Sequence, residues 1–280
     1  MRTFDGKVAV ITGAGSGIGR ALALDLATRG ARLALSDKDE VGLLETAERC
    51  TARNAREVHT EKLDVSDRAA MAAYAATVAA ELGGVDVVFN NAGIALHGEF
   101  EETSYDAFER IMDVNFWGVV HGSKEFLPHL VASGDGHLVN VSSLFGLMGM
   151  PGQTAYNASK FGVRGFTEAL RMEMLAARHP VQVSCVHPGG IKTAIARNAA
   201  TTSSHDPATV ARTFDSKLAR TSAEDAATVI LSGVLKNRPR IVVGTDAKLL
   251  DAYVRLVGAR YQRAVARIST RVGPTPTPKP

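Results

Sequence analysis

Tyr156 and Lys160 have the residue types and the spacing of a pair that could move a proton. They stand four residues apart in a segment with a helical pattern, so both side chains fall on one face of a helix. Free tyrosine is too weakly acidic to serve as a base near neutral pH, but a nearby ammonium favours the phenolate. The pair is a candidate general acid and base, although an isolated pair of this kind is more often a half-buried tyrosine beside a solvated lysine.

A second chemical feature is the glycine-rich run TGAGSGIG at residues 12–19. It follows an apolar strand pattern and opens a helical one. Its glycines would let the backbone approach a pyrophosphate, while unpaired N–H groups at the helix start would attract the negative charge. The spacing is G-x-x-x-G-x-G, because Ile18 stands where the stricter G-x-G-x-x-G fingerprint has its third glycine. A phosphate loop is the favoured interpretation, and a purely structural turn is the alternative.

Short β-branched runs alternate with longer helical patterns, which is typical of βαβ units and a parallel sheet. Right-handed crossovers give a doubly wound sheet whose ligand crevice lies beyond the carboxyl ends of the strands. We therefore expect an α/β fold with a single Rossmann-like, doubly wound parallel sheet of about seven strands and helices on both faces. The expected strands are residues 7–12, 32–36, 57–63, 86–90, 137–142, 181–186 and 240–243.

Composition limits the class of protein. The 280 residues, 45% of them hydrophobic, suffice for one large domain, which we place at residues 1–245. A formal net charge of +3 gives no reason to expect nucleic acid as a partner, and the two cysteines form no metal-binding pattern. Since neither a charged leader nor an apolar run of bilayer length is visible, we expect a cytoplasmic protein without a metal site.

Further motifs follow the glycine run in a characteristic order. They are NNAG at residues 90–93, Asn115, a serine pair at 142–143, YNASK at 156–160, and Pro188-Gly189 with Thr193. In these motifs the chain resembles the short-chain dehydrogenase/reductase family from about residue 7 to residue 243. Each motif is weak alone, but together they are highly specific.

The resemblance implies an oxidoreductase that moves a hydride between a nicotinamide cofactor and a secondary alcohol or ketone. In the family pattern Tyr156 is the general acid and base, Lys160 lowers its pKa and binds the nicotinamide ribose, and Ser143 orients the substrate oxygen. Family spacing selects Ser143 over Ser142. Asn115 resembles the asparagine that binds a water in a proton relay, and a core amide is the alternative.

The same residues separate two classes of function. The chain could be an active alcohol dehydrogenase or ketone reductase, or a cofactor-binding scaffold that keeps the fold without turnover. A scaffold would be expected to have lost at least one of the four residues, and this chain retains Asn115, Ser143, Tyr156 and Lys160. We therefore favour the enzyme.

The choice of cofactor depends on the end of the second strand. Asp37 stands where a carboxylate would accept hydrogen bonds from a ribose 2′-hydroxyl and repel a 2′-phosphate, so NAD is favoured over NADP. Lys38 beside it, and the frequent use of such an aspartate as a helix N-cap, argue the other way. The cofactor contacts implied by the resemblance are Gly13, Ser16, Gly17, Ile18, Asp37, Asp64, Val65, Asn91, Ala92, Gly93, Tyr156, Lys160, Pro188, Gly189, Ile191 and Thr193.

By resemblance, the substrate pocket is lined by residues 94–98, by residues 144–150, and by an insertion at 194–213 that we expect to be mobile and to act as a lid. These segments are largely apolar, which favours a lipophilic alcohol or ketone over the alternative of ordinary core. His97 and His187 could be polar specificity contacts, although a lone histidine is more often structural. The expected substrate contacts are Ser143, Phe145, Met150 and Tyr156.

The C-terminal end departs from the minimal family domain. From Lys236 onward ten Lys or Arg stand against two Asp, and residues 246–272 form the pattern of one basic amphipathic helix. Such a helix could lie on an anionic membrane or pack against its own core or a sister subunit; we favour packing. We expect residues 273–280 to be disordered, and family habit implies a homodimer or homotetramer.

Overall fold

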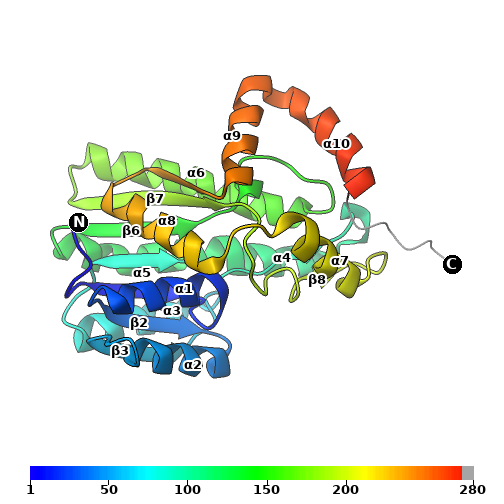
Figure 1. The fold of residues 1–280 in the computed structure, drawn as a ribbon. Helices are drawn as coiled ribbons and strands as arrows, with labels where there is room; N and C mark the ends of the chain where they lie inside the picture. Colours follow the sequence, from blue (N-terminus) through cyan, green and yellow to red (C-terminus); the bar gives the residue numbers. More distant parts are fainter. Residues whose placement is uncertain (273–280) are drawn as a thin grey trace.

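A computed structural model describes residues 1–272 of the chain, and its centre is a seven-stranded, all-parallel sheet in the order β3-β2-β1-β4-β6-β7-β9 (Figure 1). The predicted α/β fold is thereby confirmed, and all seven expected strands are present to within two residues at each end. They are β1 (Val8–Thr12), β2 (Arg32–Asp37), β3 (Glu57–Lys62), β4 (Val87–Asn90), β6 (Gly136–Val141), β7 (Val181–Pro188) and β9 (Arg240–Val243).

Helices cover both faces of the sheet because alternate strand residues point to opposite sides. Ile11 of β1 packs in one buried cluster with Leu22 and Ile230, whereas its neighbour Val10 packs in the other with Tyr74 and Phe126. The first face carries α1 (Gly17–Thr28), α2 (Glu40–Thr51) and α8 (Ala223–Leu235), and the second carries α3 (Arg68–Glu81), α5 (Gly118–Ala132) and α6 (Thr154–Ala176). The carboxyl ends of the strands are left open between them.

The insertion at 194–213 contains secondary structure that the sequence did not predict. Its β8 (Ala200–Thr201) pairs with β5 (Leu96–His97) in a separate two-stranded sheet, and α7 (Pro207–Thr213) follows. The pairing ties the insertion to the segment after β4, and the mobility of the insertion stays a prediction. Two-residue strands carry too little periodicity to be found from sequence.

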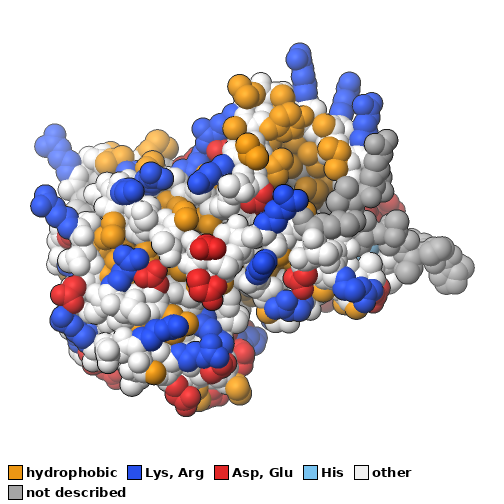
Figure 2. Space-filling model, viewed as in Figure 1, with side chains coloured by type: hydrophobic (Ala, Val, Ile, Leu, Met, Phe, Trp, Pro, Cys, Tyr) orange, Lys and Arg blue, Asp and Glu red, His pale blue; other side chains and the backbone are white. Residues whose placement is uncertain are grey.

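The C-terminal extension is two helices, α9 (Thr245–Val257) and α10 (Tyr261–Val272), and the expectation of one helix was wrong. Gly258, at φ +56°, breaks the pattern because this left-handed conformation suits glycine and ends a helix. The two helices form an arch over residues 144–150 (Figure 1). In Figure 2 hydrophobic side chains gather on this arch, with basic side chains projecting from it.

The predicted apolar stripe of the extension mostly faces the chain's own core. Leu250, Val254, Val257, Tyr261 and Val265 pack in a cluster with Leu144 and Met148, which agrees with packing as the role of the stripe. Two members of the stripe, Tyr253 and Ile268, remain exposed. The predicted disordered tail, 273–280, lies outside the described residues.

The buried histidine of β6 gives the fold a predicted acid sensitivity. His137 is 1% exposed, its Nε2 lies 2.8 Å from Ser184 Oγ, and burial lowers its pKa to about 3. An unfolded histidine titrates near pH 6.5, so the unfolded chain binds the extra proton between these two values. The contribution of neutral His137 to the free energy of unfolding is therefore complete above about pH 6.5, and it is lost as the pH falls toward about 3.

We expect His137 alone to lower the free energy of unfolding by about 3 kcal/mol between neutral pH and about pH 4.5. Urea unfolding of the native chain and of His137→Phe at both pH values measures this effect. The variant, which has no titratable ring, should lose correspondingly less stability. Equal losses in the two proteins would show that this histidine does not set the acid sensitivity.

Candidate active site

The glycine run forms a tight turn between β1 and α1, against the segment that follows β4. A Cβ on Gly13 would lie 2.8 Å from Ala92 Cα, and one on Gly19 would lie 2.0 Å from the Gly13 carbonyl oxygen. Asn91 Nδ2 donates to the carbonyl oxygens of Thr12 and Gly13, at 2.9 and 3.2 Å. Only glycine fits these positions, and their backbone is fixed beside the predicted cofactor residues 91–93.

The start of α1 is left open by the side chain that precedes it. Ser16 is extended and makes no side-chain capping bond, whereas Asp39 and Asp67 cap α2 and α3. A Cβ on Gly17, at φ +53°, would lie 3.1 Å from Thr193 Cγ2, so the loop after β7 closes over this helix start. The cradle of glycine backbone and uncapped N–H groups fits a pyrophosphate.

Asp37 lies at the mouth of this cradle. Its Oδ2 accepts a hydrogen bond of 2.8 Å from the Gly15 N–H. It is not the N-cap of α2, because Asp39 takes that role. Lys38 reaches away to Asp64, with Nζ 2.5 Å from Oδ2. The two sequence arguments against NAD at this position therefore do not apply to the observed geometry.

Asp64 and Val65 follow β3, where the resemblance places the adenine. Burial by itself would raise the pKa of Asp64, but hydrogen bonds from Lys38 and Ser66 hold it at about 2. The Val65 side chain packs against Gly118, where an added Cβ would lie 2.7 Å from Val65 Cγ2. The carboxylate therefore stays ionised and fixed beside the glycine cradle.

Ser143 follows the carboxyl end of β6, and Tyr156 lies opposite it in the first turn of α6. Ser143 lies close enough to Tyr156 to influence its pKa, and Ser143 Oγ accepts from the Phe145 N–H at 3.1 Å. Burial raises the pKa of Tyr156, and Ser143 opposes that rise. Ser142 points elsewhere, donating from Oγ to the Lys160 carbonyl oxygen at 2.8 Å. Of the two serines, the geometry brings Ser143 to the tyrosine.

Lys160 is almost fully buried beneath Tyr156. Its Nζ lies 5.6 Å from the centre of the Tyr156 ring and donates to the Val141 carbonyl oxygen at 3.1 Å. Burial lowers the pKa of Lys160 to about 8. Burial is the largest influence on the pKa of Tyr156, and the lowering of that pKa by Lys160 stays a prediction.

Asn115 lies in a π-helical turn between α4 (Tyr105–Met112) and α5, and not in a regular α-helix. Its side chain is fully used: Oδ1 accepts from the Ile94 N–H at 2.8 Å, and Nδ2 donates to the Ile94 carbonyl oxygen and to Ser159 Oγ. A Cβ on Gly93 would lie 3.1 Å from Asn115 Oδ1 and 3.4 Å from Lys160 Nζ. Asn115 therefore positions the loop after β4 beside the lysine.

Three positioning residues were not among the predicted site residues. Asp246, at the start of α9, accepts the Gly190 N–H at 2.8 Å and packs against Gly189. Tyr261 of α10 accepts the Gly149 N–H at 2.8 Å. Asn157 binds the backbone at Met150, Phe145 and Met148, which shapes the predicted substrate loop. The C-terminal arch thus touches the predicted cofactor loop after β7 and the substrate loop alike.

The remaining predicted residues lie close to these. His187 Nδ1 lies 3.0 Å from the Ser143 carbonyl oxygen, which makes it a support of that loop. The Phe145 and Tyr156 rings meet edge to face, with centroids 6.3 Å apart, and Met150 is half-buried in the arch cluster. Pro188 ends β7, and Ile191 bridges to Thr221. Predicted site residues from six segments therefore converge at one edge of the sheet.

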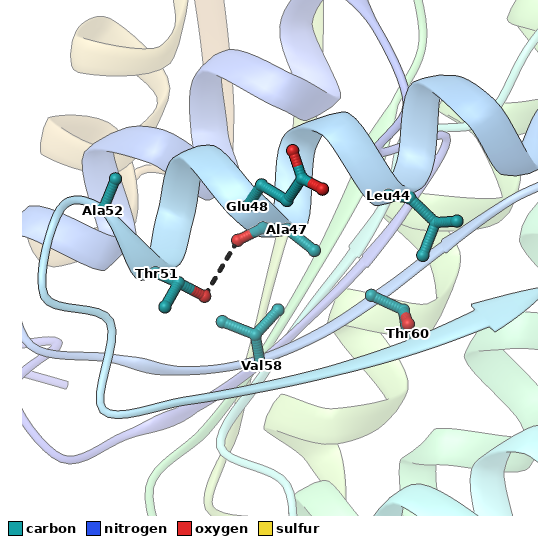
Figure 3. Close-up of a pocket in the computed structure, with 7 residues that line it drawn as sticks. All are labelled: Leu44, Ala47, Glu48, Thr51, Ala52, Val58 and Thr60. Atoms are coloured by element: carbon teal, nitrogen blue, oxygen red, sulfur yellow. Dashed lines mark hydrogen bonds between the residues drawn. The ribbon is translucent and has the colours of Figure 1, made fainter.

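A separate pocket lies between α2 and the edge strand β3 (Figure 3). It contains none of the predicted site residues and is lined by Leu44, Ala47, Glu48, Thr51, Ala52, Val58 and Thr60. Within residues 1–272, no group of three or more His, Cys, Asp or Glu side chains is placed to hold a metal ion. None of the helices described combines the length and hydrophobicity that a bilayer crossing needs.

The fold and the motif residues define a nucleotide-dependent oxidoreductase class, and the family model for short chain dehydrogenases matches residues 7–204. The chain belongs to the short-chain dehydrogenase/reductase family. An oxidoreductase of Mycobacterium tuberculosis, SadH, is 58% identical over 266 residues, covering 95% of this chain and 96% of SadH. Mouse epidermal retinol dehydrogenase 2 is 40% identical over 189 residues, covering 67% of this chain and 61% of that protein.

Solved structures show the same likeness. A short-chain dehydrogenase/reductase from Burkholderia phymatum, crystallised in complex with NAD, is 34% identical with a TM-score of 0.85 and full coverage of both chains. Levodione reductase is 30% identical with a TM-score of 0.78, covering 89% of this chain and 100% of that one. The predicted family and fold are thereby confirmed.

Proposed function

We propose that this chain is an NAD-dependent oxidoreductase that interconverts a secondary alcohol and a ketone. The observation that carries the proposal is the meeting of Ser143, Tyr156 and Lys160 beside the glycine cradle, with Lys160 Nζ 5.6 Å from the centre of the Tyr156 ring. In alcohol oxidation Tyr156 accepts the hydroxyl proton, and in ketone reduction it donates that proton back. Ser143 binds the same substrate oxygen and orients it.

The bound nicotinamide ring supplies the hydride or accepts it, and in its oxidised form it adds a positive charge to the site. The protein residues that would hold the cofactor are the glycine run, Asp37 and Asp64 with Val65, residues 91–93, Lys160, and the loop from Pro188 to Thr193. Lys160 holds the ribose hydroxyls and adds positive charge near the phenolate. Asn115 positions the loop after β4. We propose that a proton relay reaches Lys160 through this loop.

NAD is the proposed cofactor, with NADP less favoured, because Asp37 presents a fixed carboxylate at the cradle. We expect Asp37→Ala to raise the preference for NADP over NAD by roughly a hundredfold, since the variant loses hydrogen bonds to the 2′-hydroxyl and no longer repels a 2′-phosphate. Dissociation constants for NADH and NADPH, measured by calorimetry, test this shift.

Asp39→Ala is the matched control, because it removes an equal charge two residues away, from the side chain that caps α2. It should lower stability and leave the cofactor ratio unchanged. An unchanged ratio in Asp37→Ala would instead remove the carboxylate as the basis of selection.

The proposed substrate is a small, lipophilic alcohol or ketone. The substrate loop and the arch present Phe145, Met150, Leu250 and Val254 as half-buried apolar side chains. The similarity to a protein named as a retinol dehydrogenase is consistent with a lipophilic alcohol. We also propose a catalytic domain at 1–245 with a packed extension, assembly as a homodimer or homotetramer, and a cytoplasmic location in which the arch could contact membranes peripherally.

Turnover linked to NADH absorbance, across secondary alcohols, simple ketones, diketones, steroids and fatty alcohols, tests the proposal, with NADPH in parallel. Activity with NADH on at least one ketone or alcohol is the expected result. Tight NADH binding without turnover on any member of the panel would favour a cofactor-binding scaffold.

A further inference from the structure

Two histidines from distant segments meet beside the first turn of α6. The His97 and His205 rings are arranged edge to face, with centroids 4.7 Å apart. Gln153, the residue before α6, places Nε2 2.9 Å from His97 Nδ1. A Cβ on Gly152 would lie 3.0 Å from His97 Cε1. Since Tyr156 stands three residues after Gln153, the imidazole pair adjoins the turn that carries the proposed acid and base.

The position of His205 is fixed by the pairing of β5 with β8. His97 in β5 pairs with Thr201, and the Thr202 N–H donates to the His97 carbonyl oxygen at 3.1 Å. A Cβ on Gly98 would lie 2.1 Å from Thr202 Oγ1, so the two segments touch closely. The Ser204 hydroxyl donates to Glu102 at 2.6 Å. His205 is therefore held against His97 by the contacts of Thr202 and Ser204, which precede it.

His205 is 5% exposed, and neither of its ring nitrogens has a hydrogen-bond partner within the described part of the chain. Leaving a buried donor or acceptor unpaired is unfavourable, so buried histidines ordinarily find partners. His137 and His187, which are also buried, each use one ring nitrogen. A buried ring with two unused nitrogens, next to the catalytic turn, indicates that a ligand atom completes it.

The chemistry of this site selects a neutral ligand. Burial, together with the neighbouring His205, lowers the pKa of His97 to about 4, so this ring is uncharged at neutral pH. A neutral imidazole offers one N–H donor and one acceptor, which suits a carbonyl or hydroxyl oxygen and not an isolated carboxylate. Residues 94–96 and 144–150 of the predicted substrate pocket are mostly apolar, so a polar contact at the histidine pair would discriminate between substrates.

We propose that His97 and His205 form a polar subsite for a second, uncharged oxygen of the substrate, so that the preferred substrates are diketones or hydroxyketones on an apolar skeleton. This inference rests on the proposed function and makes it more specific. The hydride and proton are exchanged at the first oxygen, at Tyr156, and the second oxygen is only bound. His205, in the insertion, thereby becomes a specificity-determining residue.

The test compares an unbranched ketone with diketones of the same length that carry the second carbonyl at increasing distances from the first. In the native protein we expect at least one diketone to exceed the simple ketone in kcat/KM by roughly tenfold or more, mainly through a lower KM. In His205→Phe, which keeps the edge-to-face ring, this ratio should fall to about one, with NADH binding unchanged.

His97→Phe removes the subsite from the other ring, so the result does not depend on one variant folding. His179→Phe, at an exposed turn, is the matched control and should keep the native ratio. Equal efficiency for ketone and diketones in the native protein, or an unchanged ratio in both subsite variants, would overturn the proposal and leave a buried water as the ring's partner. Loss of turnover on the entire panel would instead overturn the proposed function itself.

Discussion

Tyr156→Phe is expected to lower kcat by roughly a thousandfold, because the variant has no group at the ring position that can exchange a proton with the substrate oxygen. Ser143 keeps its bond from the Phe145 N–H in this variant. NADH oxidation with the best ketone of the panel measures the loss. NADH binding, followed by its fluorescence, should remain within about twofold of the native protein.

Tyr253→Phe is the control for this change, since Tyr253 lies exposed on α9 and should be dispensable. A Tyr156→Phe variant that retained most of its activity would show that another group exchanges the proton. A loss of NADH binding equal to the loss of turnover would place the tyrosine in cofactor binding alone.

Lys160→Met is expected to lower kcat/KM by roughly a hundredfold and, at the same time, to make the chain more stable at neutral pH. Lys160 is 3% exposed, and burial lowers its pKa from 10.5 to about 8. At about pH 7 Lys160 is protonated in both states, but the folded chain holds this proton less tightly because the ammonium is buried. This difference lowers the free energy of unfolding by about 3 kcal/mol. Met has similar length and no charge, so the variant avoids this cost.

The pH dependence of the stability gain tests its cause. Between about pH 8 and pH 10.5 the unfolded chain holds a proton that the folded native chain has released, so the native protein gains stability as the pH rises through this range. The advantage of Lys160→Met in urea unfolding should be largest below about pH 8 and should vanish near pH 10.5. Lys124→Met, at an exposed position of α5, should show neither effect, and a destabilised Lys160→Met would contradict the assigned cost.

The sheet and the order of the motifs were predictable because they depend on local patterns. A buried parallel strand is a short apolar run, and the ends of such strands meet at one edge, so residues that follow them gather there. Gly13 was placed in this way, whereas Ser143 and Tyr156 were identified through the resemblance to the family. The break at Gly258 was missed because an apolar stripe continues on both sides of it, and the stripe alone does not report a positive φ.

The contacts that adjust the site depend on residues far apart in the chain. Asp246 reaches Gly190, Tyr261 reaches Gly149, and His205 meets His97 only because β8 pairs with β5. None of these pairs has a fixed spacing, so no periodic pattern could indicate them. The pairing of Lys38 with Asp64 could not be predicted from the sequence either. Because of this pairing, Lys38 does not neutralise the Asp37 carboxylate.

The sequence by itself determined the parallel α/β fold, the family and the set of residues able to exchange a proton and bind a nucleotide, because residue type and spacing specify these. Only the tertiary structure decided how those residues are tuned. Whether Tyr156 is more or less acidic, whether Lys160 is buried, and whether His205 has a partner depend on which atoms surround each group. Burial and nearby charge set these properties, and both arise only when distant segments pack together.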